Sequence, residues 1–262
     1  MISEGSNGLD EAPGSLDFQG HTLSCSTCQV QFDLERVRCR LGHACAHDRY
    51  APRIWRFFHQ NPEQATGWLK HPYFETRAIA AHYASPFVLT PLLDDPDETV
   101  RRAVAEKVPQ RRLRRLLRDP HREVRMRVAA RLPAAELLEL CQDSDYYVRL
   151  IVARRLPQAY LHRLVDDPDS QVRMQVARRL PEASLHLLSH DADIAVRRLV
   201  AQRAPVSLLT AAARDPAWQV RWEVACRAPA KLAQQLAEGD TDSEVREAAR
   251  ERLSQLQSQS PG

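Results

Sequence analysis

Residues 167–190 read DPDSQVRMQVARRLPEASLHLLSH, and this 24-residue pattern recurs along most of the chain. The dipeptide Val-Arg marks the register, with successive steps of 24, 24, 24, 24, 24 and 25 residues. Its positions are Val100-Arg101, Val124-Arg125, Val148-Arg149, Val172-Arg173, Val196-Arg197, Val220-Arg221 and Val245-Arg246. So regular a register indicates a repeat protein, in which each unit packs against its neighbours.

Each repeat has the pattern of a helix of about three turns followed by a shorter helical piece. An Asp lies five residues before the Val and is often followed by Pro, as in Asp167-Pro168, so we expect it to cap the helix. Two Val positions and one Ala position form a single apolar stripe. A second proline, such as Pro181, ends the helix, and no strand-like alternation appears. The sequence therefore predicts an all-α solenoid of stacked repeats.

The repeats become degenerate at both ends of the array, as capping units do. We predict about eight units over residues 62–253, preceded by a four-cysteine module over residues 21–61. The polar ends, residues 1–20 and 254–262, are expected to be disordered. Nine of the sixteen aromatic residues lie between Tyr50 and Phe87, where they are expected to pack the module against the first repeat.

Composition argues against several classes of function. Only eight glycines are present and none lies between Trp68 and Glu238, so that stretch holds no phosphate-binding loop or dinucleotide fingerprint. No catalytic motif is present, so an enzyme is not predicted; electron transfer is the one redox role the cysteines allow. No apolar run is long enough to span a membrane. The first 20 residues lack Lys and Arg, which predicts no signal peptide and a reducing, cytoplasmic location.

Four of the six cysteines are clustered with the spacing C-x2-C-x10-C-x5-C, namely Cys25, Cys28, Cys39 and Cys45. In a reducing compartment such a group indicates metal ligands. A four-thiolate shell suits either zinc or an iron–sulfur cluster. Nearby residues that could replace a thiolate or offset the negative charge are His21, His43 and His47, expected mainly at the surface, and Arg36, Arg38, Arg40 and Arg49. The isolated Cys141 and Cys226 are expected to have packing or incidental roles.

The charge pattern bears on the partner. A formal charge of +3 is too small to imply a polyanion. Arginine recurs directly after the register Val, and Arg or Lys recurs six residues later, so stacked repeats could follow phosphates. The Asp positions have the same period, however, and are expected to pair with the first Arg column. Nucleic acid is therefore possible but not favoured, and an unknown protein partner on a solenoid face is preferred.

A four-cysteine module ahead of 24-residue D-P-x-x-x-V-R-x-x-V-A repeats that end in R-L-P resembles the leucine-rich repeat variant proteins of nitrogen-fixing bacteria. The resemblance covers about residues 21–253. It implies a right-handed superhelix of alternating α- and 3-10 helices without β-sheet, and an N-terminal four-iron four-sulfur (4Fe–4S) cluster bound by Cys25, Cys28, Cys39 and Cys45, with zinc as the alternative. The expected function is an interaction scaffold with a structural or redox-responsive cluster; the alternative is a zinc-stapled or nucleic-acid-binding solenoid.

Overall fold

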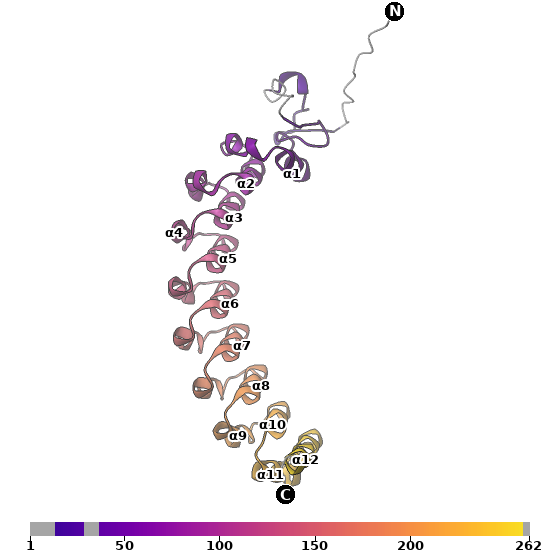
Figure 1. The fold of residues 1–262 in the computed structure, drawn as a ribbon, viewed down its shortest axis with the longest axis vertical. Coiled ribbons are helices and arrows are strands. Elements are labelled where there is room, and N and C mark those ends of the chain that lie inside the picture. The colour runs from indigo at the N-terminus through magenta and orange to yellow at the C-terminus, as the bar shows by residue number, and fades with distance from the viewer. Residues whose placement is uncertain (1–13, 29–36, 259–262) are drawn as a thin grey trace, which may run out of the picture. The chain divides into compact units, whose positions relative to one another are not determined.

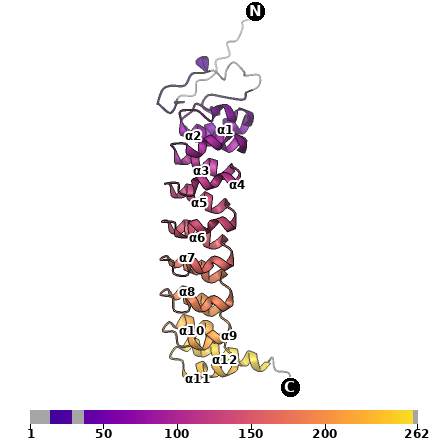
Figure 2. The ribbon, with the colours of Figure 1, turned by 90° about the vertical axis from the view of Figure 1, so that its left-hand side faces the viewer.

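The computed structural model describes residues 14–28 and 37–258 of the 262-residue chain. The chain divides into two compact units, Met1–Leu132 and Pro133–Gly262, each of which contains a stack of short helices (Figures 1 and 2). This division lies within the repeats, whereas the sequence analysis placed a border between residues 61 and 62. Among the described residues, no helix has both the length and the apolar character needed to cross a membrane.

The first unit carries the cysteine-containing segment and the first repeats, with α3 and α5 on one side of the stack and α4 on the other (Figure 1). Its helices are η1 (Cys25–Thr27), α1 (Ala51–Gln60), η3 (Pro62–Trp68), α2 (Phe74–Tyr83), η4 (Pro86–Val88), η5 (Thr90–Asp94), α3 (Glu98–Lys107), α4 (Gln110–Leu113), η6 (Arg114–Leu116) and α5 (Arg122–Arg131), where η denotes a 3-10 helix.

The second unit continues the pattern. Its helices are η7 (Ala134–Gln142), α6 (Tyr146–Arg155), η8 (Gln158–Leu164), α7 (Ser170–Arg179), η9 (Glu182–Leu188), α8 (Ile194–Arg203), α9 (Val206–Ala212), α10 (Trp218–Ala225), α11 (Ala230–Gly239) and α12 (Ser243–Ser258).

The predicted all-α repeat is confirmed: in the described ranges the only β pairing is two isolated bridges, and α-helices alternate with 3-10 helices over most of the array. The shorter piece departs from the 3-10 form in α9 and α11, which are α-helical, and in its first part also in α4. The sequence of α11, AKLAQQLAEG, is rich in strong helix formers, which explains why a full α-helix forms there.

The core follows the predicted stripe. In the six repeats from Val100 to Val224, the two Val positions and the Ala position are at most 4% exposed. The small Ala, for example Ala177 beside Val176, allows a neighbouring element to approach closely. Since no helix buries this stripe by itself, stacking of neighbours within each unit stabilises the repeats.

The predicted helix cap is wrong by two residues. Helix α7 begins at Ser170, and its N-cap is Asp169, whose Oδ1 accepts the N–H of Gln171 at 2.8 Å. Asp167 lies outside the helix and accepts the N–H of Asp169 at 2.9 Å. The second proline acts as predicted, because α7 ends at Arg179, two residues before Pro181.

The predicted disordered ends are wrong at their inner edges. Leu16 forms an antiparallel bridge with Thr22, and the Phe18 ring stacks on Tyr73 with centroids 5.4 Å apart. At the other end, α12 continues to Ser258. Residues 1–13 and 259–262 lie outside the described residues.

Candidate functional site

The first two predicted ligands lie on one tight turn. Ser24 is the N-cap of η1, and its Oγ accepts the N–H of Ser26 at 3.3 Å. The N–H of Cys28 then donates to the carbonyl of Cys25 at 3.2 Å. Residues three apart in a 3-10 turn lie on the same side, so this turn places Cys25 and Cys28 on one side of the backbone.

The segment that leads to Cys39 is held by a buried side chain that the sequence analysis missed. Asn61, directly after α1, is 1% exposed. Its Oδ1 accepts the N–H of Arg38 at 2.7 Å, and its Nδ2 donates to the carbonyls of Arg38 at 2.8 Å and Phe57 at 2.7 Å. Asn61 therefore fixes the backbone next to Cys39 against the end of α1.

Cys45 is held by a second set of contacts. Gly42, with φ 73°, makes the turn that returns the chain from Arg40 to Ala44, as expected of a residue without Cβ. The N–H of Cys45 donates to the carbonyl of Arg53 at 3.2 Å. Thr76 of α2 is fully buried, and its hydroxyl donates to the carbonyl of the next residue, Ala46, at 3.0 Å. Helices α1 and α2 thus position this cysteine.

The four thiols are half-buried and lie close enough to influence one another. Burial raises the pKa of Cys39, and the neighbouring Cys28 and Cys25 raise it further. Burial raises the pKa of Cys45 to about 11, with smaller contributions from Cys28 and Asp48. Within residues 14–28 and 37–258, no three His, Cys, Asp or Glu side chains are placed to bind a single metal ion.

This donor set fits an iron–sulfur cluster. None of the four cysteines is in a disulfide bond, so each can supply one thiolate. The raised pKa values of Cys39 and Cys45 show that these two thiols do not ionise readily by themselves, and bound iron favours their deprotonated form. The thiolates of a 4Fe–4S cluster bind four separate irons, whereas zinc requires all four donors around one ion.

The histidines of this region have other partners. His47 packs edge-on against Trp68, with ring centroids 4.7 Å apart, and His21 contacts the carboxylate of Asp17 at 3.2 Å. His43 is exposed, as are Arg38, Arg40 and Arg49, while Arg36 lies outside the described residues. Of the two isolated cysteines, Cys141 is 7% exposed, which confirms its predicted packing role, and Cys226 is half-buried.

Aromatic rings join the cysteine-containing segment to the first helices, as predicted. Phe57 and Phe58 of α1 are buried, and both contact the ring of Trp68. The stack of Phe18 on Tyr73 and the contact of His47 with Trp68 extend this packing to the segment that carries the cysteines. Phe87 and Tyr50 are exceptions, since they are 79% and 56% exposed.

His71 makes the first unit sensitive to acid. Burial, together with the positive charge of His47 when it is protonated and of Arg77, lowers the pKa of His71 to about 4. Because the folded chain holds this ring neutral, the stability it contributes is complete above pH 6.5 and is lost as the pH falls towards 4. In His71→Asn, the amide oxygen can replace Nδ1 as the acceptor for the N–H of Tyr73. Over this pH range the variant should lose about 1 kcal/mol less of its free energy of unfolding than the wild type, allowing for solvent screening.

The measurement is the urea midpoint of the wild type and of His71→Asn at several pH values across this range. The exposed His59 offers the control His59→Asn, which should follow the wild-type curve. A His71→Asn curve that also follows the wild type would contradict the prediction.

The first arginine column is used within the repeats. Arginines of this column donate Nε and Nη2 to both oxygens of an Asp in the next repeat, at 2.7–3.1 Å in the six pairs named below. The pairs are Arg77–Asp95 and Arg101–Asp119 in the first unit, and Arg149–Asp167, Arg173–Asp191, Arg197–Asp215 and Arg221–Asp240 in the second. The Asp side chains are 2–7% exposed, so the expected Arg–Asp pairing is confirmed and these guanidiniums are not available to phosphates.

The second cationic column caps helices. Arg131, Arg179 and Arg227 each donate to a carbonyl in the last turn of the preceding repeat's α-helix, at 2.7 Å. The ammonium of Lys107 likewise donates to the carbonyl of Ala84, the residue directly after α2, at 2.6 Å. A cation at a helix C-terminus also offsets the negative end of the helix dipole. Neither column therefore presents a row of free cations.

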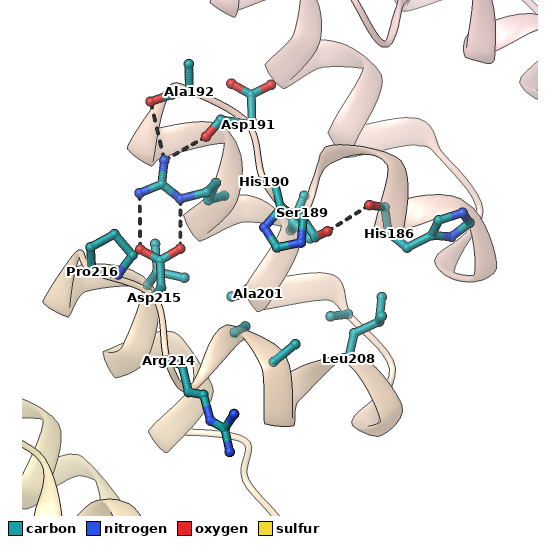
Figure 3. Close-up of a pocket in the computed structure, with 16 residues that line it drawn as sticks. His186, Ser189, His190, Asp191, Ala192, Ala201, Leu208, Arg214, Asp215 and Pro216 are labelled. Carbon is teal, nitrogen blue, oxygen red and sulfur yellow. Dashed lines mark hydrogen bonds and ion pairs between the residues drawn. The ribbon is translucent and has the colours of Figure 1, made fainter.

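The second unit contains a hollow of about 820 Å³ between η9, α8 and α9, with Asp215 at one end and His186 at the other in Figure 3. Ala204 and Ala212 both line it. At the position of Ala212, the four preceding repeats have Leu116, Leu140, Leu164 and Leu188, all at most 3% exposed. The hollow therefore arises where a repeat lacks its usual large side chains.

Ala212→Leu should fill part of this hollow. It restores the side chain of the other repeats, so we expect a gain of about 0.5 to 2 kcal/mol in the free energy of unfolding, measured by urea denaturation. Ala195→Leu, at an exposed position of α8 that does not line the hollow, is the matched control and should change stability by less than about 0.5 kcal/mol. A destabilised Ala212→Leu variant would show that the hollow cannot accept a leucine side chain.

Two parts of the chain match known families. Residues 15–67 match the family described as "LRV protein FeS4 cluster", and residues 146–169 match the leucine-rich repeat variant. The first match includes all four clustered cysteines and confirms the predicted 4Fe–4S cofactor. An "uncharacterized 27.7 kDa protein in nifB 3'region" of Rhodobacter capsulatus is 48% identical over 101 residues, which span 38% of this chain and 41% of that protein.

A solved structure resembles most of the chain. It is described as a leucine-rich repeat variant with a novel repetitive protein structural motif, and it is 41% identical in sequence with a TM-score of 0.81. The match covers 88% of this chain and 99% of the solved chain. On this likeness and on the repeats described above, the chain belongs to the leucine-rich repeat variant family.

Proposed function

We propose that the protein is an interaction scaffold whose 4Fe–4S cluster is bound by Cys25, Cys28, Cys39 and Cys45. The observation that carries the ligand assignment is the group of half-buried, mutually coupled thiols, positioned by the η1 turn and by buried contacts to α1 and α2. The scaffold role is supported by the repeat architecture, because stacked repeats present extended surfaces to partners.

Each part of the chain has a defined task in this proposal. Cys25 and Cys28 bind from one turn, and Cys39 and Cys45 bind from the loop that Gly42 reverses. Asn61 and Thr76 orient the last two ligands through their bonds to the flanking backbone. When bound, the cluster supplies one-electron chemistry and a rigid link between these segments.

The test is anaerobic purification followed by iron and sulfide analysis, visible absorption and electron paramagnetic resonance. About four irons and four sulfides per chain are expected. Each of the variants Cys25→Ser, Cys28→Ser, Cys39→Ser and Cys45→Ser should lose most of the iron, whereas Cys226→Ser should retain it. A colourless protein with one zinc ion per chain would overturn the iron–sulfur assignment.

Two alternatives to protein binding are less well supported. Nucleic-acid binding along the repeats required free arginine columns, and the arginines of both columns described above form bonds within the repeats. Catalysis has no support from the two matched families, which are a cluster module and a repeat. Electron transfer by the cluster is the redox role that we keep in the proposal. We also propose a cytoplasmic location, supported by six cysteines that form no disulfide bond.

A further inference from the structure

Positive charge is concentrated in one short part of the first unit. Residues 101–131 contain twelve Lys and Arg against three Asp and Glu, a formal charge of +9, although the whole chain carries only +3. The remainder of the chain is therefore net acidic. The even Arg–Asp pairing of the other repeats does not explain so uneven a distribution.

Much of this charge lies at the surface of one repeat. Leu113 and Leu116 occupy the buried positions of α4 and η6, so the arginines around them point to solvent. We call the five exposed arginines of residues 111–118 the arginine cluster: Arg111, Arg112, Arg114, Arg115 and Arg118. Figure 1 shows α4 on the side of the first unit opposite to α3 and α5.

The arginine cluster is only partly neutralised. Arg115 pairs with Asp94 of the preceding repeat, and both side chains are largely exposed. Arg111, Arg112 and Arg118 form no ion pair with any residue that the structure describes. Unlike the arginine columns, these three side chains hold no helix end and join no neighbouring repeats, so folding does not account for them.

An exposed apolar pair lies beside the arginine cluster. Phe87 and Val88 of η4 are one 24-residue step before Arg111 and Arg112, and they are 79% and 39% exposed. The Arg115–Asp94 pair joins these two repeats on the same side. Aromatic and arginine side chains together are typical of the centres of protein interfaces.

The cationic positions are confined to one repeat. One step earlier, the residues that correspond to the arginine cluster are Phe87, Val88, Thr90, Pro91 and Asp94; one step later, they are Ala135, Glu136, Leu138, Glu139 and Gln142. None of these ten residues is basic. A nucleic acid that followed the repeats would leave the cations after a single unit, whereas a compact acidic partner needs only this patch.

We propose that the arginine cluster, together with Phe87 and Val88, is the docking surface for a partner protein with an acidic face that also carries an apolar side chain. Arginine forms bidentate bonds with carboxylates and keeps its charge at any physiological pH. The opposite charges speed association and orient the partner, and the apolar pair supplies the buried centre of the contact. The inference rests on the scaffold role of the proposed function but not on the cluster ligands.

The test uses three labelled probes: a peptide of Glu with interspersed Leu, an all-Glu peptide of the same charge, and a short DNA duplex. Binding to the purified full chain with its cluster is measured by fluorescence anisotropy at about 50 and 200 mM salt. We expect the Glu/Leu peptide to bind more tightly than the other two probes, and about tenfold more weakly at the higher salt. Phe87→Ala should weaken the binding of the Glu/Leu peptide and leave the binding of the all-Glu peptide unchanged.

Charge variants make the test specific. Changing Arg111, Arg112 and Arg118 together to Glu should lower affinity for the Glu/Leu peptide at least tenfold, and changing them to Gln should lower it less. The matched control changes Arg154, Arg214 and Arg250 to Glu, three exposed arginines of the second unit that also form no ion pair with a described residue. This control alters the net charge equally and should leave most of the binding intact.

Two results would overturn the proposal. An equal loss of binding in the control would show that only net charge matters, and tighter binding of the duplex that depends on the arginine cluster would identify a nucleic-acid site. Circular dichroism checks the fold of each variant, and the Gln set remains informative where the Glu set unfolds. Iron content should stay at the wild-type value in all of them, so failure here is distinct from failure of the cysteine assignment.

Discussion

Replacing Asp167 by Asn should lower the free energy of unfolding by about 3 to 5 kcal/mol. The side chains of Arg149 and Asp167 are 9% and 2% exposed and join two repeats through two bonds of 2.7 and 3.0 Å. Asn can still accept the N–H of Asp169, so the substitution removes the negative charge and keeps the local turn. The guanidinium of Arg149 is then left buried without its counter-ion, which is the source of the large effect.

Urea denaturation followed by circular dichroism measures this loss. Because a repeat protein is stabilised mainly by contacts between neighbours, weakening one contact should also broaden the transition or divide it in two. Asp166→Asn makes the same chemical change at an exposed neighbouring position and should shift stability by less than about 0.5 kcal/mol. The double variant Arg149→Met with Asp167→Leu should recover part of the loss, because no charge remains buried. Equal midpoints for Asp167→Asn and Asp166→Asn would contradict the argument.

Asn61→Ala should destabilise the cysteine-containing segment by about 3 kcal/mol, since it leaves the N–H and carbonyl of Arg38 without their buried partner and removes one of the two donors to the carbonyl of Phe57. Two of these three bonds hold the residue next to Cys39. The variant should therefore also release iron to a ferrous chelator faster than the wild type does. Both quantities are measurable on the same anaerobic sample, by denaturation and by the absorbance of the chelate.

The neighbouring Gln60 is exposed, and Gln60→Ala provides the control that should match the wild type in both measurements. If Asn61→Ala released iron at the wild-type rate although its stability had fallen, the support that Asn61 gives to Cys39 would be irrelevant to the cluster. An unchanged stability would show that water replaces the lost bonds.

The repeat could be predicted from the sequence because every feature recurs in several copies. Matching periods also predicted the pairing of the Asp and Arg columns. The N-cap was wrong because Asp167 and Asp169 both precede the helix, and only the arginine of the neighbouring repeat selects between them. A signal was present: the position of Asp169 is His121 and Ala217 in two other repeats, whereas the position of Asp167 is Asp in all seven repeats that carry the Val-Arg dipeptide. A helix cap is replaceable, but the partner of a buried arginine is not.

The candidate site was less predictable. Cysteine spacing identified the four thiols, and the comparisons support the cofactor, but nothing in the spacing pointed to Asn61 or Thr76. Neither contact is part of the repeat pattern. Asn61 bonds to backbone 23 residues away and Thr76 to backbone 30 residues away, so their roles depend on the folded arrangement. The net charge was also misleading, since +3 for the whole chain conceals +9 within residues 101–131.

The Arg–Asp pairs have a consequence for how the chain's length can change during evolution. Most pairs join residues 18 apart, and removal or duplication of any 24-residue block within a unit recreates the same spacing at the new junction. Recombination between such blocks therefore yields a shorter or longer array with every buried carboxylate still matched. The pair Arg221–Asp240, with a spacing of 19, shows that a single inserted residue was also absorbed next to α11, where the chain forms a full α-helix.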